Sequence, residues 1–300
     1  MALYDKTVYR NPAQVYLSSL DSGVSLKNCT SVLNNVCKKM GYSGFMDYPW
    51  LRFDYVELLK LKRLLIDSDV LPKTVNHYLM IVKCVCREAW RLRTMTTDTY
   101  MRIKDVKRVK GHSTPTGRAL NQSELKKLIN YQPDTNNPID IRDSAIIAAA
   151  YGAGLRRSEL TLLDSDSYVG NKILVHGKGN VQSFVYLPDF AKNAIDRWLR
   201  LKPIETAPLF THVHASGFIS DKRLATRTIG DIIKRRQVNA GITHFTPHDL
   251  RRSFATNLID SGIDLFTVQK LMRHADIGTT RTYDMRHEQI QIDAIKMLPF

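Results

Sequence analysis

The sequence predicts a mainly α-helical protein with a small antiparallel β-sheet, built as a helical domain followed by a mixed α/β domain. Apolar residues recur at helical spacing through most of the N-terminal third. Residues 104–117 (KDVKRVKGHSTPTG) lose this periodicity and gather Lys, Gly, Ser, Thr and Pro, as interdomain linkers do. Farther on, two short strand-like segments flank a glycine-rich turn. We therefore expect a helical domain over 1–103, a linker over 104–117, and a mixed domain over 118–300 that ends in a tail, 286–300.

Four helices are predicted in the first domain. Asn and Pro at 11–12 suit the cap and first turn of one helix, and Ser25 begins another that stops at Gly41. A Leu-rich helix covers about 53–66. The clearest helix begins near Thr74 and has one continuous apolar stripe. That stripe consists of Val75, Tyr78, Leu79, Val82, Cys86 and Ala89.

The second domain begins with a capping signal, Asn121 followed three residues later by Glu124. The segment 140–151 is apolar on all sides and predicts a buried helix. Amphipathic helices are expected over 190–201 and 226–238. Together these segments predict a helical scaffold around the small sheet.

The strand-like segments are 172–175 and 182–187, separated by His-Gly-Lys-Gly-Asn. Glycines 177 and 179 can supply the positive φ angles of a hairpin turn. Lys178 lies between them, so its ammonium group is placed to reach a ligand. By itself, a turn lysine of this kind is more often an ordinary surface residue.

Composition and charge restrict the kind of partner. The chain has 300 residues and a formal net charge of +15, with an excess of Lys and Arg in both predicted domains. This balance favours a polyanionic partner over an acidic small substrate. The four cysteines show no metal-ligand spacing, and no segment is apolar enough for secretion or membrane insertion. We therefore expect reduced thiols in a cytoplasmic protein without a membrane segment.

Two helices carry exposed cations. Lys83, Arg87 and Arg91 recur at i, i+4 and i+8, and no Glu lies four residues before any of them. Such a stripe is often only a solvated face, but the missing counter-charges favour contact with a DNA backbone. Lys234 and Arg235 lie near the end of another helix, where the helix dipole already favours cations. DNA contact is a second, compatible role for them.

The densest set of reactive side chains lies in THFTPHDLRRSFATNLIDSGIDLFTVQKLMRHADIGTTRTYD. Thr246 can cap a helix whose first turns carry His248 and Arg251 on one face, near the electropositive end. Those groups could hold a phosphate. His274 and Tyr283 follow. Each residue alone is an ordinary helix residue, but their order and spacing indicate a phosphate clamp beside a hydroxyl nucleophile.

Three segments resemble the tyrosine recombinase (phage integrase) family: GAGLRRSEL its first catalytic box, PHDLRRSFATNLIDSG its second, and LMRHADIGTTRTYD its His-to-Tyr box. The resemblance implies a core-binding domain followed by a catalytic domain of tyrosine recombinase type. It also implies that Arg156 binds phosphate and that Glu159 orients it. From the residues alone, GAGLRRSEL could equally be a glycine helix stop before a surface Arg–Glu pair.

The resemblance further implies cleavage and rejoining of DNA through a 3′-phosphotyrosyl intermediate, which conserves bond energy without a cofactor or metal. The implied catalytic groups are the nucleophile Tyr283, the phosphate ligands Arg156, Arg251 and His274, the general acid Lys178, and the proton-transfer residue His248. Two positions depart from the family pattern. Arg252 stands where histidine is common, and Arg273 stands where glycine is common.

The implied partner is double-stranded DNA with inverted-repeat core sites, bound by a homotetramer that exchanges C-terminal tails, with possible accessory DNA-bending proteins. Packing of the apolar tail on its own domain is an alternative. The biological role expected from the resemblance is integration or excision of a mobile element encoded by a bacterium or phage. A chromosome-dimer resolvase of the same family and a DNA-binding regulator that does not cut are the alternatives.

Overall fold

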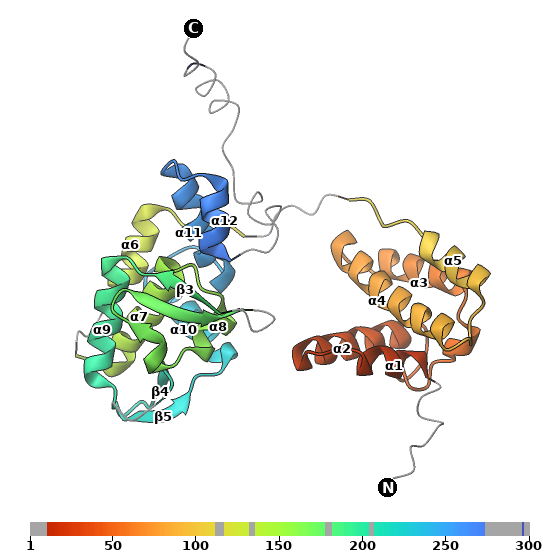
Figure 1. Cartoon of the computed structure of the whole chain (residues 1–300), viewed down its shortest axis with the longest axis horizontal. Helices are drawn as coiled ribbons and strands as arrows, with labels where there is room; N and C mark the ends of the chain where they lie inside the picture. The colour runs from red at the N-terminus through yellow and green to blue at the C-terminus, as the bar shows by residue number, and fades with distance from the viewer. Residues whose placement is uncertain are drawn as a thin grey trace. The chain divides into compact units, whose positions relative to one another are not determined.

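In the computed structural model the chain forms two compact units, Met1–Thr116 and Gly117–Phe300 (Figure 1). The described residues are 11–111, 117–131, 136–177, 182–203, 207–273 and 296. Each unit has its own apolar core. Within the described ranges, no helix is long and apolar enough to cross a membrane.

The first unit is helical and is organised around α4. Its elements are α1 (Pro12–Ser18), α2 (Gly23–Lys39), η2 (Trp50–Arg52), α3 (Tyr55–Asp67), α4 (Pro72–Arg91) and α5 (Thr97–Asp105). Helix α4 packs against α1, α2, α3 and α5. Of its predicted stripe, Val75, Leu79, Val82, Cys86 and Ala89 are buried. The prediction of this helix and of its inward face is confirmed.

Two helix starts in the first unit differ from the sequence prediction. Helix α2 begins at Gly23, two residues earlier than expected, because Ser22 is its cap and the Ser22 hydroxyl accepts a hydrogen bond from the Ser25 backbone N–H at 3.5 Å. Helix α5 was not predicted. Its cap is Thr96, whose hydroxyl accepts from the backbone N–H of Thr99 at 3.2 Å, but only one of its residues, Ile103, is buried. A helix with so small an apolar face leaves almost no periodic signal.

The expected linker therefore begins inside the first unit. Residues 104 and 105 close α5, and Val106 and Val109 pack on the core of this unit. The side chain of Asn76 on α4 also exchanges two hydrogen bonds with the Val109 backbone, at 2.8 and 3.0 Å. Residues 112–116 lie outside the described part of the chain.

The second unit surrounds α7, which is buried on every side and packs against α6, α8, α9, α10 and α11 (Figure 1). Its helices are α6 (Gln122–Asn130), α7 (Pro138–Gly152), α8 (Arg157–Leu162), η3 (Ser165–Ser167), α9 (Asp189–Leu201), α10 (Thr226–Asn239), α11 (Pro247–Asp260) and α12 (Leu265–Met272). The predicted buried helix and the predicted capping box of Asn121 and Glu124 are confirmed.

Two small antiparallel sheets complete the second unit. One has the order β1 (Tyr168–Val169), β2 (Lys172–His176), β3 (Gln182–Tyr186), with Ile173 opposite Val185 on the buried face. The predicted hairpin is confirmed, although its turn, 178–181, lies outside the described residues. The second sheet, β4 (Thr211–Val213) with β5 (Ile219–Arg223), was not predicted, because a three-residue strand is too short to show alternation.

Candidate active site

A recess of about 430 Å³ opens on the second unit where α8, α10 and α11 begin. It is lined by Leu155, Arg156, Arg157, Ser158, Thr226, Thr246, Pro247, His248 and Arg251. Three residues predicted for the phosphate clamp, Arg156, His248 and Arg251, therefore share one concave surface. They come from segments about ninety residues apart in the chain.

Arg156 is placed by a tight turn after α7. Gly154 has a φ of 56°, and a Cβ atom there would lie 2.6 Å from a ring carbon of Phe254, so both conformation and space require glycine. Arg156 then occupies the N-cap of α8, where its backbone N–H donates to Glu159 Oε2 at 2.8 Å. Its Nη1 donates to Glu159 Oε1 at 2.7 Å. The expected pairing of arginine and orienting carboxylate is thus formed within one helical turn.

His248 and Arg251 are placed by the start of α11. Asp249 accepts hydrogen bonds from the backbone N–H and the hydroxyl of Thr246, both at 2.8 Å, which fixes the first turn. Arg251 is only 1% exposed, and its guanidinium donates to the backbone carbonyls of Gly154 and Met272. These bonds tie α11 to the turn before α8 and to the end of α12.

Glu159 is the carboxylate that organises this site. It is 5% exposed and accepts from Arg156 and, at 2.8 Å, from Nη2 of Arg273, while Arg251 Nη1 lies 3.9 Å away. Burial alone would raise the pKa of Glu159, but the charge of Arg273 and the hydrogen bonds from Arg156 hold it below its ordinary value. Glu159 is therefore an anion at neutral pH, surrounded by three guanidinium groups.

His248 keeps access to solvent but stands among cations. Desolvation in the recess lowers its pKa, and the nearby charges of Arg251, Arg252 and Arg156 lower it further, against a smaller opposite effect of Asp249. The imidazole is therefore neutral near pH 7, and one ring nitrogen can accept a proton. Two guanidiniums, an imidazole and the N-terminus of α11 together suit a phosphate oxygen.

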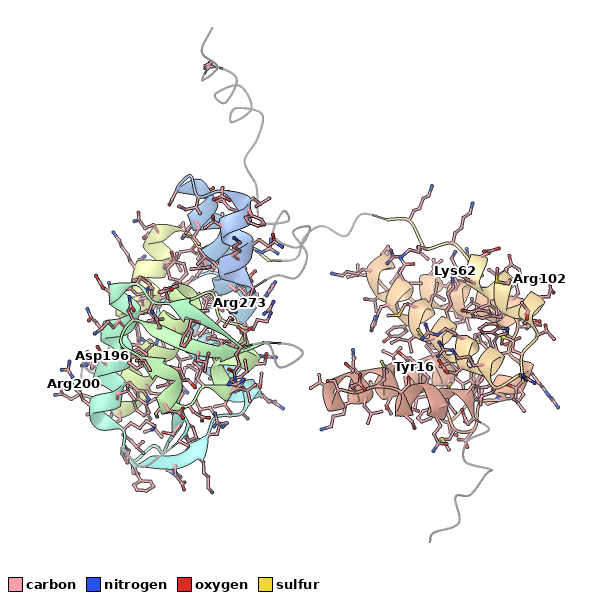
Figure 2. The ribbon with its side chains drawn as sticks, viewed as in Figure 1. Tyr16, Lys62, Arg102, Asp196, Arg200 and Arg273 are labelled. Atoms are coloured by element: carbon pink, nitrogen blue, oxygen red, sulfur yellow. The ribbon has the colours of Figure 1, made fainter. Side chains whose placement is uncertain are left out.

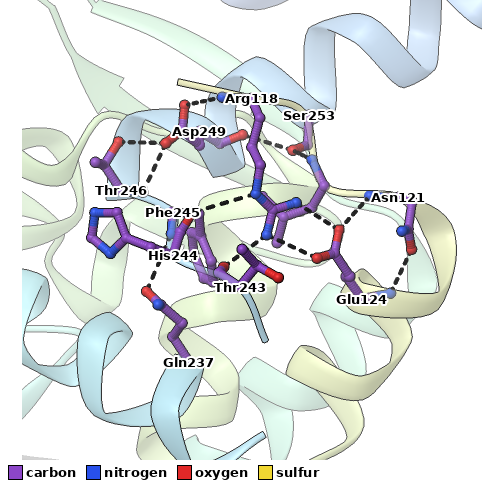
Figure 3. A network of polar contacts seen from close by, with 11 residues as sticks. Arg118, Asn121, Glu124, Gln237, Thr243, His244, Phe245, Thr246, Asp249 and Ser253 are labelled. Atoms are coloured by element: carbon purple, nitrogen blue, oxygen red, sulfur yellow. Dashed lines mark hydrogen bonds and ion pairs between the residues drawn. The ribbon is translucent and has the colours of Figure 1, made fainter. Parts of the chain in front are cut away.

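The N-terminal end of α11 is held by a polar network that involves the first residues of the second unit (Figure 3). Arg118 forms a two-point ion pair with Glu124, at 2.7 and 2.8 Å, and also donates to the carbonyls of residues 243–244. Its backbone N–H donates to Asp249 Oδ1 at 3.1 Å. The sequence predicted the capping box but not this network, because the network joins residues 118–124 to residues 243–249, more than a hundred positions later in the chain.

The two departures from the family pattern both contact carboxylates. Arg252 Nε lies 3.7 Å from Asp249 Oδ1, next to the network at the base of α11. Arg273, labelled in Figure 2, ends α12 with its backbone in the left-handed region and its guanidinium on Glu159. No role for Arg273 was assigned from the sequence, since its contact with Glu159 spans 114 residues.

The other predicted site residues fall into two groups. Lys178, His274 and Tyr283 lie outside the described residues, as does the tail apart from residue 296. Lys234 and Arg235 follow Thr226, which lines the recess, by two helical turns, or roughly 12 Å along α10. Lys234 is exposed, whereas Arg235 pairs with buried Asp143 on α7.

The basic stripe on α4 is partly neutralised within the first unit. Lys83 Nζ donates to the carbonyls of Lys104 and Val106, at 2.9 and 2.7 Å, and burial lowers its pKa. Arg87 and Arg91 share Glu88, at 3.6 and 3.0 Å, although both remain substantially exposed. The counter-charge thus comes from Glu88, which follows Arg87 directly and precedes Arg91 by three residues, and not from a position four residues earlier.

Comparison with known proteins supports the same family. The model of the Phage integrase family matches residues 118–289, more than half of the chain. Tyrosine recombinase XerC of Alcanivorax borkumensis is 34% identical over 178 residues, which cover 57% of each chain. Tyrosine recombinase XerC of Staphylococcus haemolyticus is 40% identical over 149 residues, which cover 48% of each chain. The alignments thus span only about half to three fifths of these relatives.

Solved structures show the same fold at low sequence identity. The Tn1549 transposon integrase in complex with circular intermediate DNA superposes with a TM-score of 0.68 at 17% identity, covering 96% of this chain and 98% of that one. A lambda integrase dimer bound to a core site gives 0.67 at 16% identity, with coverages of 92% and 96%. The resemblance seen in the three catalytic boxes is confirmed, and the chain belongs to the phage integrase, or tyrosine recombinase, family.

Proposed function

We propose that this chain is a site-specific DNA recombinase that cleaves and rejoins DNA through a 3′-phosphotyrosyl intermediate at Tyr283. The observation that carries the proposal is the recess in which Arg156 and Arg251 meet His248 at the start of α11. A phosphodiester is an anion whose charge shifts onto its non-bridging oxygens as it reacts. Fixed guanidinium groups and a helix N-terminus stabilise that charge.

In the proposed cleavage step, the Tyr283 oxygen attacks phosphorus while the bond from phosphorus to the 5′ oxygen breaks. The tyrosine proton leaves toward a neighbouring base, and the 5′ oxygen receives a proton, so the charge of the diester is conserved. The proposed roles are phosphate binding by Arg156, Arg251 and His274, leaving-group protonation by Lys178, and proton transfer by His248. The lowered pKa of His248 supports its role as a neutral proton acceptor at pH 7.

The test is covalent capture. A library of nicked duplexes with a randomised core is incubated with the protein, and protein–DNA adducts that survive denaturant are isolated and sequenced. We expect adducts from the parent protein and none from Tyr283→Phe. Tyr186→Phe is the matched control, because this tyrosine is exposed on β3 and has no proposed role in catalysis. Absence of adducts from the parent, or their persistence in Tyr283→Phe, contradicts the proposal.

Two biological roles fit this chemistry: integration or excision of a mobile element, and resolution of chromosome dimers. The transposon and lambda integrases, whose names correspond to the first role, share the fold of this chain at 15–17% identity. Relatives named tyrosine recombinase XerC, at 34% and 40% identity, favour the second. Sequencing adducts captured in cells separates the roles. Junctions at the ends of a mobile element support integration, and one fixed chromosomal site supports dimer resolution.

We further propose that the protein acts as a homotetramer on inverted-repeat sites and exchanges its C-terminal tail, 286–300, between protomers. Accessory DNA-bending proteins are a further expectation. A lambda integrase tetramer bound to a Holliday junction has the same fold with a TM-score of 0.69. In the helical unit, the proposal of DNA contact now rests on Arg87 and Arg91, because carbonyl oxygens already hold Lys83.

A further inference from the structure

Arg273 occupies a backbone conformation that favours glycine. It ends α12 with φ 53° and ψ 45°, where a Cβ atom crowds the backbone. Its side chain is nevertheless only 12% exposed, and Nη2 donates to Glu159 Oε2 at 2.8 Å. Nη1 donates to the carbonyl of Leu271 at 3.2 Å. An arginine is thus kept at an unfavourable backbone position and directed at one carboxylate.

The charges around that carboxylate explain what this contact does. Arg156 and Arg251 line the recess, and both lie within 4 Å of Glu159. Arg273 also pairs with Glu159 but does not line the recess. Without Arg273, the charge of Glu159 would offset one of the two recess cations. With it, the four groups carry a net charge of about +2, and the excess faces the recess.

Geometry points the same way. Glu159 Oε1 is engaged by the Arg156 side chain, whereas Oε2 receives the Arg156 backbone N–H and the Arg273 guanidinium. Bonds from α8 and from the end of α12 therefore fix the carboxylate plane. A fixed plane in turn fixes the direction of the Arg156 guanidinium, which is 41% exposed and would otherwise be mobile.

We propose that Arg273 is a positioning residue that holds Glu159 and supplies its counter-charge, so that Arg156 and Arg251 present uncompensated charge to the scissile DNA phosphate. This inference rests on the function proposed above. Direct contact between Arg273 and DNA, or a purely structural contribution to α12, would be different roles. A double-mutant cycle with Glu159 distinguishes them.

The cycle compares the parent, Arg273→Gly, Glu159→Gln and the double variant. The measurement is the single-turnover rate of adduct formation on a nicked duplex selected with the parent protein. We expect Arg273→Gly to slow the parent about tenfold, and to slow Glu159→Gln by less than about threefold, because no carboxylate then needs a counter-charge. Arg273→Lys keeps the charge without the planar fork and should recover part of the rate.

Arg93→Gly is the matched control. Arg93 also has a left-handed backbone, with φ 58°, but belongs to the first unit, and no role in the recess is proposed for it. Like Arg273→Gly, this variant removes one positive charge and places glycine at a left-handed backbone position. Since it lies outside the proposed site, its rate of adduct formation should equal that of the parent. Circular dichroism of each variant confirms that the fold is retained.

The possible outcomes are separable. Arg273→Gly could slow adduct formation by the same factor in the parent and in Glu159→Gln, or could leave the parent's rate unchanged. Either result overturns the inference while the proposed function stands. If Arg273→Lys is as slow as Arg273→Gly, the counter-charge is not what matters, and the inference is overturned as well. If the parent forms no adduct, the proposed function fails, and this inference fails with it.

Discussion

At the scale of single residues, the site depends on one buried carboxylate. Glu159 contacts arginines from α8, α11 and the end of α12, so it connects three helices as well as orienting Arg156. Removing one partner of a buried charged group usually costs more than the pair contributes, because the remaining charges stay buried without compensation. The consequences of changing Glu159 should therefore appear in both stability and catalysis.

We expect Glu159→Gln to lower the free energy of unfolding of the second unit by roughly 3 kcal/mol at pH 7. The folded-state pKa of Glu159 lies below its ordinary value of 4.5, so this contribution is complete above pH 4.5 and disappears as the pH falls through the folded-state value. The difference between parent and variant should therefore shrink below pH 4.5. Urea unfolding followed by the fluorescence of buried Trp198, with Trp50 and Trp90 replaced by Phe, measures it.

Asp164→Asn is the control for this experiment. Asp164 pairs with Arg223 in the same unit, but its side chain is 40% exposed, so its loss should cost less than about 1 kcal/mol. A Glu159→Gln variant as stable as this control would show that the arginines do not depend on the carboxylate.

Arg156→Ala should retain DNA affinity and lose cleavage. In the proposed reaction, Arg156 stabilises charge that develops on the phosphate, and loss of one such donor typically slows catalysis by about a hundredfold or more. Gel-shift affinity and adduct rate on the same duplex provide the two measurements. Arg200→Ala, on the exposed face of α9 (Figure 2), removes the same charge away from the recess. Equal loss of affinity and cleavage in Arg156→Ala would identify the residue as a binding or folding element.

At the scale of elements, the sequence predicted helices with strong caps or continuous apolar stripes. The capping box before α6, the buried helix α7 and the stripe of α4 each combine local signals that agree. Helix α5 and the β4–β5 hairpin were missed because each is too short or too polar to be periodic. In the site, order and spacing pointed to His248 and Arg251, and the family resemblance implied the roles of Arg156 and Glu159, but neither predicted the contact of Arg273 with Glu159. Such long-range pairs depend on how helices pack, which no local pattern encodes.

Helix α4 provides a prediction about DNA contact. Replacing both Arg87 and Arg91 by Ala should weaken duplex binding and reduce the slope of log K against log salt by about 1.8, or roughly 0.9 for each phosphate contact. Titrations at several salt concentrations measure the slope. The control is the double replacement of Arg63 and Arg102 by Ala. Both arginines form surface ion pairs in the same unit, and their replacement removes the same charge. An unchanged slope for the α4 variant would remove this helix from the proposed DNA surface.

At the scale of the whole molecule, both units belong to a strongly basic chain, which suits binding to a long polyanion. The proposed exchange of tails would make each active site depend on a neighbouring copy. Deleting residues 286–300 should then abolish higher assemblies on DNA while leaving single-site binding intact. Sedimentation of protein–DNA complexes measures this. If the assemblies persist and the second unit becomes less stable, the tail packs on its own domain instead.

The hydrogen bonds that join residues 117–120 to α11 have a mechanical consequence. Gly117, with φ 111°, lies against Asp249, the next residue donates to the same carboxylate, and the Leu120 backbone N–H donates to the Ser253 hydroxyl at 2.7 Å. The polypeptide arriving from the helical unit is thus fastened to the very helix that presents His248 and Arg251. If the protein binds DNA as proposed, a displacement of Gly117 or Arg118 would act directly on the first turn of α11. DNA binding by the helical unit and cleavage in the recess would then be coupled through a few hydrogen bonds.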